Sequence, residues 1–298
     1  MKILLFGKNG QVGWELQRSL TPLGEVIALS PDNQDYCGDF TNLSGLAETI
    51  QQIKPDIIVN AAAHTAVDKA ESETELAQTI NTYAPALLAR EAKLLNAWLI
   101  HYSTDYVFDG SGNTPWIETD ATAPLGVYGA TKLAGEQAIQ ASGCKHLIFR
   151  TSWVYGTRGN NFAKTMLRLA QERDSLTVIN DQIGAPTGAD LLADVTAHAI
   201  RTTQSQPELS GLYHLVASGE TSWHGYASYV IDYVQQLGLE LKTTPESIAP
   251  VPTSAFPTPA QRPKNSRLNT HKLQTSFDLT LPTWQTGVAR MLSEFIEK

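Results

Sequence analysis

The stretch KILLFGKNGQVGWEL, residues 2–16, decides the fold. It opens on five nearly continuous apolar residues, the pattern of a parallel strand that helices cover on both faces. Gly7, Gly10 and Gly13 follow, and a periodicity typical of a helix begins inside this glycine-rich turn. A strand, a glycine-rich turn and a helix in this order predict the start of a β-α-β unit.

The same alternation continues along the first 180 residues. Further apolar runs predict strands at 26–30, 56–62, 98–103, 146–152 and 176–181. Helical patterns lie between the strands, at 11–20, 43–53, 73–96, 127–142 and 160–172. Strand–helix alternation of this length predicts an α/β fold with a doubly wound, Rossmann-type parallel sheet.

The pattern changes after about residue 182. Helices are expected at 190–200, 223–238 and at the end of the chain, with a strand at 211–216. Six prolines in 245–263 exclude a regular helix and predict an ordered, extended loop. We therefore expect a dinucleotide-binding Rossmann-type domain at 1–182. A smaller C-terminal α/β substrate-binding region at 183–298 is expected to be interleaved with it.

The composition is that of an acidic, globular protein. Of the 298 residues, 42% are hydrophobic and 17% charged, and the net charge is −8. Without a Lys/Arg cluster, we expect neither nucleic acid nor an anionic membrane as a partner. Cys37 and Cys144 are expected to be reduced thiols. The apolar runs are too short for a signal-peptide core or a membrane span, so we expect the cytoplasm.

The glycine-rich turn predicts a cofactor. Its spacing is G-x-x-G-x-x-G, placed between the first strand and the first helix. The pyrophosphate of a dinucleotide needs backbone close by, and the N-terminus of a helix offers free N–H groups and the positive end of its dipole. We expect Gly7, Gly10 and Gly13 to cradle the pyrophosphate, with backbone contacts from Gln11 and Val12.

The end of the second strand leaves the choice of cofactor open. An acidic residue there would bind the adenosine ribose 2′-OH, but this chain has Ser30, followed by Pro31 and Asp32. Further on, GDF at 38–40 is either a contact on the adenine side or a loop turn with Phe40 in the core. Both NADH and NADPH therefore remain open.

Tyr128 and Lys132 are four residues apart in a predicted helix, so their side chains share one face. An ammonium near a phenol stabilises the phenolate and is expected to lower the pKa of Tyr128 toward the working range. The Y-x-x-x-K pattern alone occurs by chance in many helices. Its meaning depends on the strand ends that the fold brings near it.

Two strand ends raise the chance of a reaction site. HYSTDYVFDG places Ser103, Thr104 and Asp105 at the end of the fourth predicted strand, where open α/β sheets bind their ligands. Capping of the strand end is the alternative reading of these three residues. The run of small residues at 61–63, after the third strand, lets a cofactor lie against the backbone.

Together these motifs resemble the extended short-chain dehydrogenase/reductase family, and within it the dTDP-4-dehydrorhamnose reductases. The finer resemblance rests on NAAAHTAVDKAE, YSTDYVFDG, PLGVYGATKLAGE, RTSWVYG, NFAKTMLRLA, NDQIGAPT, GLYHLV and RPKNSRL, in this order. It covers about residues 1–295. One departure is Ser30, where such reductases often carry Asp.

The resemblance implies reduction of the C4 ketone of dTDP-4-dehydro-β-L-rhamnose by NADPH or NADH. The product, dTDP-L-rhamnose, is a donor for cell-surface polysaccharide. Tyr128 would donate the proton, Lys132 would bind the nicotinamide ribose and tune Tyr128, and Thr104 would hydrogen-bond the ketone oxygen. Implied cofactor contacts are Gly10, Gln11, Val12, Asp39, Phe40, Ala63, His64, Thr65, Tyr128 and Lys132. Ser30 is a further candidate cofactor contact because of its place at the end of the second strand. Implied substrate contacts are Thr104, Asp105 and Trp153. The guanidinium groups of Arg262 and Arg267 suit a diphosphate, and solvated surface arginines are the alternative reading.

The resemblance also implies a homodimer with structural Mg²⁺ at its interface, for which Glu15, Asp190 and Glu294 are the matching carboxylates. By sequence alone these three acids are ordinary surface residues. Two alternatives remain. One is a reductase or epimerase–reductase for another NDP-4-keto sugar. The other is a non-catalytic NADP-binding regulator like that of methionine adenosyltransferase, which the complete set of Thr104, Tyr128 and Lys132 disfavours.

Overall fold

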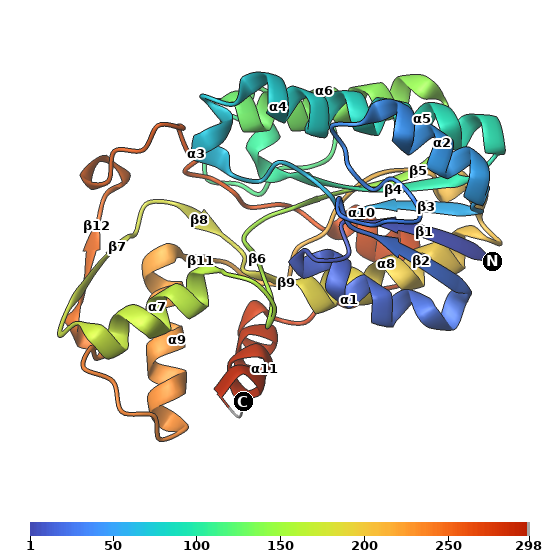
Figure 1. Ribbon diagram of the computed structural model, residues 1–298. Helices are drawn as coiled ribbons and strands as arrows, with labels where there is room; N and C mark the ends of the chain where they lie inside the picture. The colour runs from blue at the N-terminus through green and yellow to red at the C-terminus, as the bar shows by residue number, and fades with distance from the viewer. Residues whose placement is uncertain (297–298) are drawn as a thin grey trace.

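The computed structural model describes residues 1–296 and contains a central sheet of six parallel strands (Figure 1). The strands are β1 Lys2–Phe6, β2 Glu25–Leu29, β3 Ile57–Asn60, β4 Trp98–Thr104, β5 Lys145–Thr151 and β10 Gly211–His214. Their order across the sheet is β10-β5-β4-β3-β1-β2. The predicted α/β fold with a parallel, doubly wound sheet is confirmed.

Helices cover both faces of this sheet (Figure 1). One layer holds α1 Gln11–Leu20, α8 Ala189–Thr203 and α10 His271–Phe277; the other holds α2 Leu43–Ile53, α5 Ala84–Leu95 and α6 Val127–Ser142. Side chains alternate along a strand, so Ile3 and Leu5 join the core under the first layer while Leu4 and Phe6 join the core under the second. This two-sided burial explains the continuous apolar runs.

The strand order reverses direction at β1, which pairs with β2 on one side and with β3 on the other. In open α/β sheets, ligands bind outside the carboxyl ends of the strands at such a switch point. The glycine-rich turn leaves the sheet there, and so does the segment that follows β3. The fold therefore places both predicted cofactor segments at one crevice.

A second body packs beside the sheet (Figure 1). It contains α7 Phe162–Glu172, α9 Trp223–Gln236 and α11 Trp284–Ile296, and the parallel pair β7 Leu176–Ile179 and β12 Ile248–Val251. Tyr226 and Trp284 lie in its own core cluster. The strand expected at 176–181 thus belongs to this body, and the proline-rich loop supplies its partner strand.

Elements from both sides of residue 182 contribute to each body. The second half of the chain supplies β10 and α8 to the central sheet and its cover, whereas α7 and β7 from the first half pack with α9. The division into 1–182 and 183–298 stays a prediction. Apolar patterning identifies strands such as 211–216, but it does not tell which sheet a strand joins.

The helix expected at 73–96 is interrupted. It forms α4 Thr74–Gln78, a π-helical turn at Thr79–Tyr83, and α5. Pro85 in the first turn of α5 has no N–H to donate, which suits a helix start. Such π turns are frequent at functional sites, and this one carries the buried Asn81.

The remaining elements are short. They are α3 Val67–Ala70, the strand pairs β6 Val154–Tyr155 with β9 Thr187–Gly188 and β8 Ile183–Gly184 with β11 Thr221–Ser222, and 3₁₀ turns at Thr21–Leu23, Asp105–Val107, Pro207–Leu209, Pro245–Ser247 and Thr253–Ala255. None of the helices within residues 1–296 combines the length and apolar character that crossing a bilayer requires.

Candidate active site

Two of the three positions in the glycine-rich turn, Gly7 and Gly13, fit only glycine. Gly7 has φ +87°, and a Cβ at this position would lie 2.7 Å from the Ala61 carbonyl carbon. A Cβ at Gly13 would lie 2.0 Å from the Gly7 carbonyl oxygen. Gly10 caps α1 without a side chain, so no side-chain cap takes up the first N–H groups of the helix. This backbone cradle fits the pyrophosphate of a dinucleotide.

An acidic residue, Asp32, follows the end of β2. Ser30 is buried, and its side chain hydrogen-bonds the exposed Asp32 carboxylate. This bond lowers the pKa of Asp32, and the charge of Lys8 lowers it slightly further. Ser30 therefore holds the Asp32 side chain, and contact of either residue with a cofactor remains a prediction.

The GDF segment at 38–40 has a clear structural role. Phe40 is buried and packs edge-on against Phe6, with ring centroids 5.4 Å apart. The Asp39 carboxylate accepts hydrogen bonds from the backbone N–H and the hydroxyl of Thr41, at 2.9 and 2.8 Å. Both side chains thus shape the loop beside the crevice, and their cofactor contacts remain a prediction.

The segment after β3 is held by the π turn. Asn81 accepts a hydrogen bond from the His64 N–H at 2.9 Å and donates one to the His64 carbonyl oxygen at 3.1 Å. The His64 ring contacts Glu73, whereas its buried Nδ1 has no partner. Ala63 and Thr65 flank this histidine. Sequence reasoning missed Asn81, because an asparagine inside a helical pattern does not show that its side chain bonds the backbone of a distant segment.

Tyr128 and Thr104 meet at the carboxyl edge of the sheet, where α6 begins beside the end of β4. Their side chains are hydrogen-bonded, and the Thr104 hydroxyl also donates to Asp105 at 3.1 Å. Burial raises the pKa of Tyr128 to about 12; the Thr104 bond opposes the rise and the Asp105 charge adds to it. The expectation that a neighbouring ammonium lowers the pKa of Tyr128 is therefore wrong.

The physical reason lies in the contacts of Lys132. Its Nζ donates to the Tyr102 carbonyl oxygen at 2.6 Å and lies 3.3 Å from Nε2 of His101. Burial lowers the pKa of this amine to about 8, while the carboxylate of Glu136 opposes the change. Burial therefore disfavours the charged form of Lys132. Desolvation has a larger effect on the pKa of Tyr128 than any charge near it.

Asp105 is a buried carboxyl with spare bonding capacity. Burial raises its pKa to about 6, and hydrogen bonds from Ser266 and Thr104 partly oppose this. One of its oxygens, Oδ2, has no hydrogen-bond partner among residues 1–296. A buried acceptor left open in this way suits a hydroxyl group of a bound ligand.

The other expected substrate residues lie around this edge. Trp153 has φ +50° and stacks on Trp223, with ring centroids 3.7 Å apart. Both arginines are committed to carboxylates: Arg262 to Asp68 at 2.7 Å, and Arg267 to Glu220 at 2.7 Å. Contact with a diphosphate would require either arginine to leave its present partner.

A cavity of about 320 Å³ lies next to these residues. Its lining includes Gly184 and Arg267 but not Thr104, Tyr128 or Lys132. A Cβ added at Gly184 would touch the ring of Trp153. The cavity therefore borders the tryptophan and does not contain the reacting groups.

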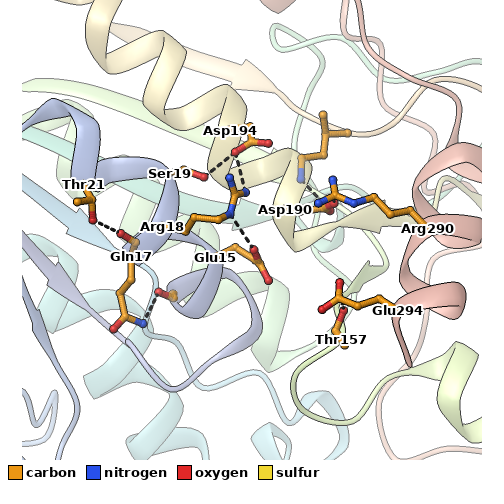
Figure 2. Close-up of polar contacts among 12 residues, drawn as sticks. Glu15, Gln17, Arg18, Ser19, Thr21, Thr157, Asp190, Asp194, Arg290 and Glu294 are labelled. Atoms are coloured by element: carbon orange, nitrogen blue, oxygen red, sulfur yellow. Dashed lines mark hydrogen bonds and ion pairs between the residues drawn. The ribbon is translucent and has the colours of Figure 1, made fainter. Parts of the chain in front are cut away.

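The acids expected to hold magnesium line one small pocket (Figure 2). Asp190 pairs with Arg290 at 3.2 Å, Glu15 with Arg18 at 3.6 Å, and Glu294 accepts from the Thr157 hydroxyl at 3.2 Å. Burial raises the pKa of Glu15, and the nearby carboxylates add to the rise while Arg18 opposes it.

These carboxylates do not form a metal site as they stand. Across residues 1–296, no group of three or more His, Cys, Asp or Glu side chains is placed to hold a metal ion. Mg²⁺ takes oxygen ligands in near-octahedral geometry, whereas arginines already occupy two of the acids. The three acids named from the sequence do line one pocket, but the sequence did not reveal that two of them pair with arginines.

Known proteins match the chain along its whole length. The family model described as RmlD substrate binding domain matches residues 1–297. A dTDP-4-dehydrorhamnose reductase of Shigella flexneri is 64% identical over 294 residues, 99% of this chain and 98% of that protein.

Solved structures agree with this match. A dTDP-4-dehydrorhamnose reductase from Clostridium acetobutylicum has a TM-score of 0.88 at 35% identity, over 99% of this chain and 100% of that one. One from Bacillus anthracis, in complex with NADP, has a TM-score of 0.86 at 36% identity, over 100% and 99%. The resemblance read from the motifs is thereby confirmed, and the chain belongs to the RmlD substrate-binding family.

Proposed function

We propose that this protein reduces the C4 ketone of dTDP-4-dehydro-β-L-rhamnose to dTDP-L-rhamnose, with NADPH or NADH as the hydride source. The observation that carries the proposal is the pairing of Tyr128 with Thr104 at the sheet edge that also holds the glycine cradle. The names of the relatives support the substrate, and the NADP complex of one of them supports the cofactor.

The geometry supports a separate role for each of Tyr128, Thr104 and Asp105 in the reduction. A bound nicotinamide supplies a hydride to the carbonyl carbon, which leaves negative charge on the ketone oxygen. Tyr128, whose raised pKa keeps it protonated near neutral pH, donates its proton to that oxygen. Thr104 hydrogen-bonds the same oxygen and so stabilises the charge as it develops. Asp105 accepts a hydrogen bond from a sugar hydroxyl through its open oxygen.

The reaction is tested by incubating the protein with NADPH and dTDP-4-dehydro-L-rhamnose. We expect one dTDP-L-rhamnose to form for each NADPH that is oxidised. Absorbance measures the loss of NADPH, and chromatography measures the product. Other NDP-4-keto sugars serve as matched controls and should be turned over more slowly. Tight NADPH binding without reduction of any of these sugars would favour a regulatory protein instead.

For the cofactor, we propose that both NADH and NADPH are used. Asp32, held by Ser30, offers an acceptor for the ribose 2′-OH, and Lys8 offers positive charge for a 2′-phosphate. Since an exposed pair contributes up to about 1 kcal/mol, the preference should be only severalfold. Asp32→Asn should shift kcat/KM toward NADPH severalfold; an unchanged ratio would remove Asp32 from ribose recognition.

We also propose a homodimer in which the acidic pocket lies near the contact, with magnesium entering only when Arg290 releases Asp190. The exposed Trp14, next to Glu15 on α1, supports a contact at this face. Sedimentation with Mg²⁺ or with chelator tests both points. Arg290→Gln should strengthen Mg²⁺ binding, and an Arg290→Gln protein that binds no Mg²⁺ would leave the acids as charge-compensated surface groups.

A further inference from the structure

Behind the lysine of the active site lies a buried polar chain of three residues. Asn60 and His101 are register neighbours on β3 and β4, with Asn60 Nδ2 3.0 Å from Nδ1 of the ring. The other ring nitrogen, Nε2, lies 3.3 Å from Nζ of Lys132. Each of the three residues is at most 2% exposed, so water does not compete for these contacts.

The backbone fixes the direction of this chain. Oδ1 of Asn60 accepts the Ala62 N–H at 3.1 Å, so the amide NH₂ group faces the histidine. An NH₂ group only donates, and Nδ1 of His101 must therefore accept. A neutral ring that accepts at Nδ1 carries its proton on Nε2, which points this N–H at Lys132.

The ammonium form of Lys132 conflicts with that arrangement. An ammonium has three donors and no acceptor, and the Tyr102 carbonyl oxygen takes one of them. An Nε2–H would then oppose a second donor at 3.3 Å. The neutral amine, by contrast, accepts from Nε2–H. Protonation of His101 offers no relief, since burial and the charge of Lys132 lower its pKa well below the usual range.

Two arrangements give both ring nitrogens of His101 a matching partner. In the first, the Lys132 amine accepts from Nε2–H, and Asn60 stays bonded to Ala62. In the second, the Lys132 ammonium donates to a bare Nε2, the ring carries its proton on Nδ1, and the Asn60 amide turns its oxygen toward Nδ1. The second arrangement leaves the Ala62 N–H facing the Asn60 NH₂ group, so both donors then need an acceptor from the segment expected to meet the cofactor.

We propose that Asn60 and His101 are positioning residues that form a proton-linked switch. The charge of Lys132, the tautomer of His101 and the orientation of the Asn60 amide change together. This proposal rests on the proposed function for the role of Lys132 at the nicotinamide ribose. A cofactor that binds the ammonium then selects the Nδ1–H tautomer and the turned amide.

The surrounding charges leave this linkage intact. On α6, Glu136 faces Lys132 and favours its ammonium, but Glu136 is itself paired with the buried Arg150 of β5 at 2.7 Å. Tyr128 on α6 and Asp105 after β4 interact with each other through charge. The only titratable group that contacts the amine directly among residues 1–296 is His101.

The direct test is nitrogen NMR of the protein with ¹⁵N-labelled histidine, without cofactor and with NADPH. The His101 signals are assigned by their loss in His101→Phe. On crossing the Lys132 pKa of about 8, His101 should change from Nδ1–H at lower pH to Nε2–H at higher pH. With NADPH the change should move to higher pH. A single tautomer across the whole range would overturn the proposal.

Asn60→Asp sharpens the test, because a carboxylate only accepts and so holds the proton on Nδ1. Nε2 then accepts from the ammonium permanently, and the pH at which NADPH affinity falls should rise by about 1–3 units. The double variant Asn60→Asp/His101→Phe carries the same carboxylate but lacks the imidazole nitrogens. An equal rise in the double variant would show a charge effect alone and contradict the switch.

These measurements need no sugar substrate, so they separate the two proposals. If no 4-keto sugar is reduced while the tautomer still changes with pH, the proposed function fails and the switch stands. If turnover is normal while His101 keeps one tautomer, the switch fails and the proposed function stands. If Asn60→Asp does not fold, the NMR titration of the unmodified protein still decides.

Discussion

The edge of the sheet around Tyr128 and the acidic pocket around Glu15 differ in whether their buried charged groups have a partner of opposite charge. At the sheet edge, Lys132 is buried without a carboxylate bonded to it, and Asp105 keeps an open oxygen. In the acidic pocket, each of Glu15 and Asp190 has an arginine. Burial raises the pKa of Glu15 as well, but Arg18 opposes that rise, and compensated pairs of this kind are common on surfaces. Residues whose pKa values are shifted by burial without such a partner cluster at functional sites. The comparison therefore favours the first region as the place of the proposed chemistry.

The sharpest test of this comparison is Tyr128→Phe, which keeps the ring and removes the proton donor. General-acid catalysis contributes about 10²–10⁴-fold, so kcat should fall by that factor. NADPH affinity, measured by fluorescence titration, should stay within about threefold because the ring and Lys132 remain. A variant with near-normal kcat would move the proton donor to another residue.

Lys132→Met should weaken function and strengthen the fold. It should lower kcat and NADPH affinity together, since it removes the charge expected at the ribose. Folding lowers the pKa of Lys132 from 10.5 to about 8, so unfolding takes up a proton between these values and stability rises with pH there. Below pH 8 the buried ammonium destabilises the fold, and the variant should gain roughly 1–3 kcal/mol at neutral pH.

Urea unfolding of both proteins at several pH values measures this gain. The advantage of Lys132→Met should shrink as the pH rises from about 8 toward 10.5. Lys93→Met, on the exposed side of α5, is a control for loss of an amine and should show no such pH dependence. Equal stability of Lys132→Met and the unmodified protein at neutral pH would mean that the lysine is well solvated.

Asp105→Asn is expected to have a smaller effect on stability, with the opposite pH window. The pKa of Asp105 rises from 3.8 to about 6 on folding, so its favourable contribution is complete below pH 3.8 and is lost as pH rises through 6. The variant should match the unmodified protein near pH 4 and exceed it by about 1–2 kcal/mol at pH 7.5. Thermal melts at both pH values check this; a gain at pH 4 would point to repacking.

The smallest effect should come from the acidic pocket. Glu15→Gln removes one partly exposed pair, in which Arg18 offsets the burial of the Glu15 carboxylate, so stability should change by no more than about 1 kcal/mol. The kcat with saturating NADPH should stay within about twofold, because no reacting group touches this pocket. A large loss of kcat here would break the comparison and make the pocket part of the catalytic machinery.

The sequence was a good guide to the central sheet and a poor guide to the environment of its site. α2 forms at 43–53 as predicted, because its helical periodicity and its Asn42 cap are local signals. The burial that raises the pKa of Tyr128 is produced by segments far apart in the chain, so the local pattern gave the wrong direction. Asn60 and His101 were hidden for the same reason, since each lies within an apolar strand.

The late arrival of β10 has a consequence for how the chain folds during synthesis. β5 ends at residue 151, but the strand that covers its open edge begins at Gly211, and α10 begins only at His271. A growing chain therefore carries a bare sheet edge and an incompletely covered apolar face until most of it has left the ribosome. Contacts between such distant segments slow folding, so the nascent first half is the stage most exposed to aggregation and to capture by chaperones.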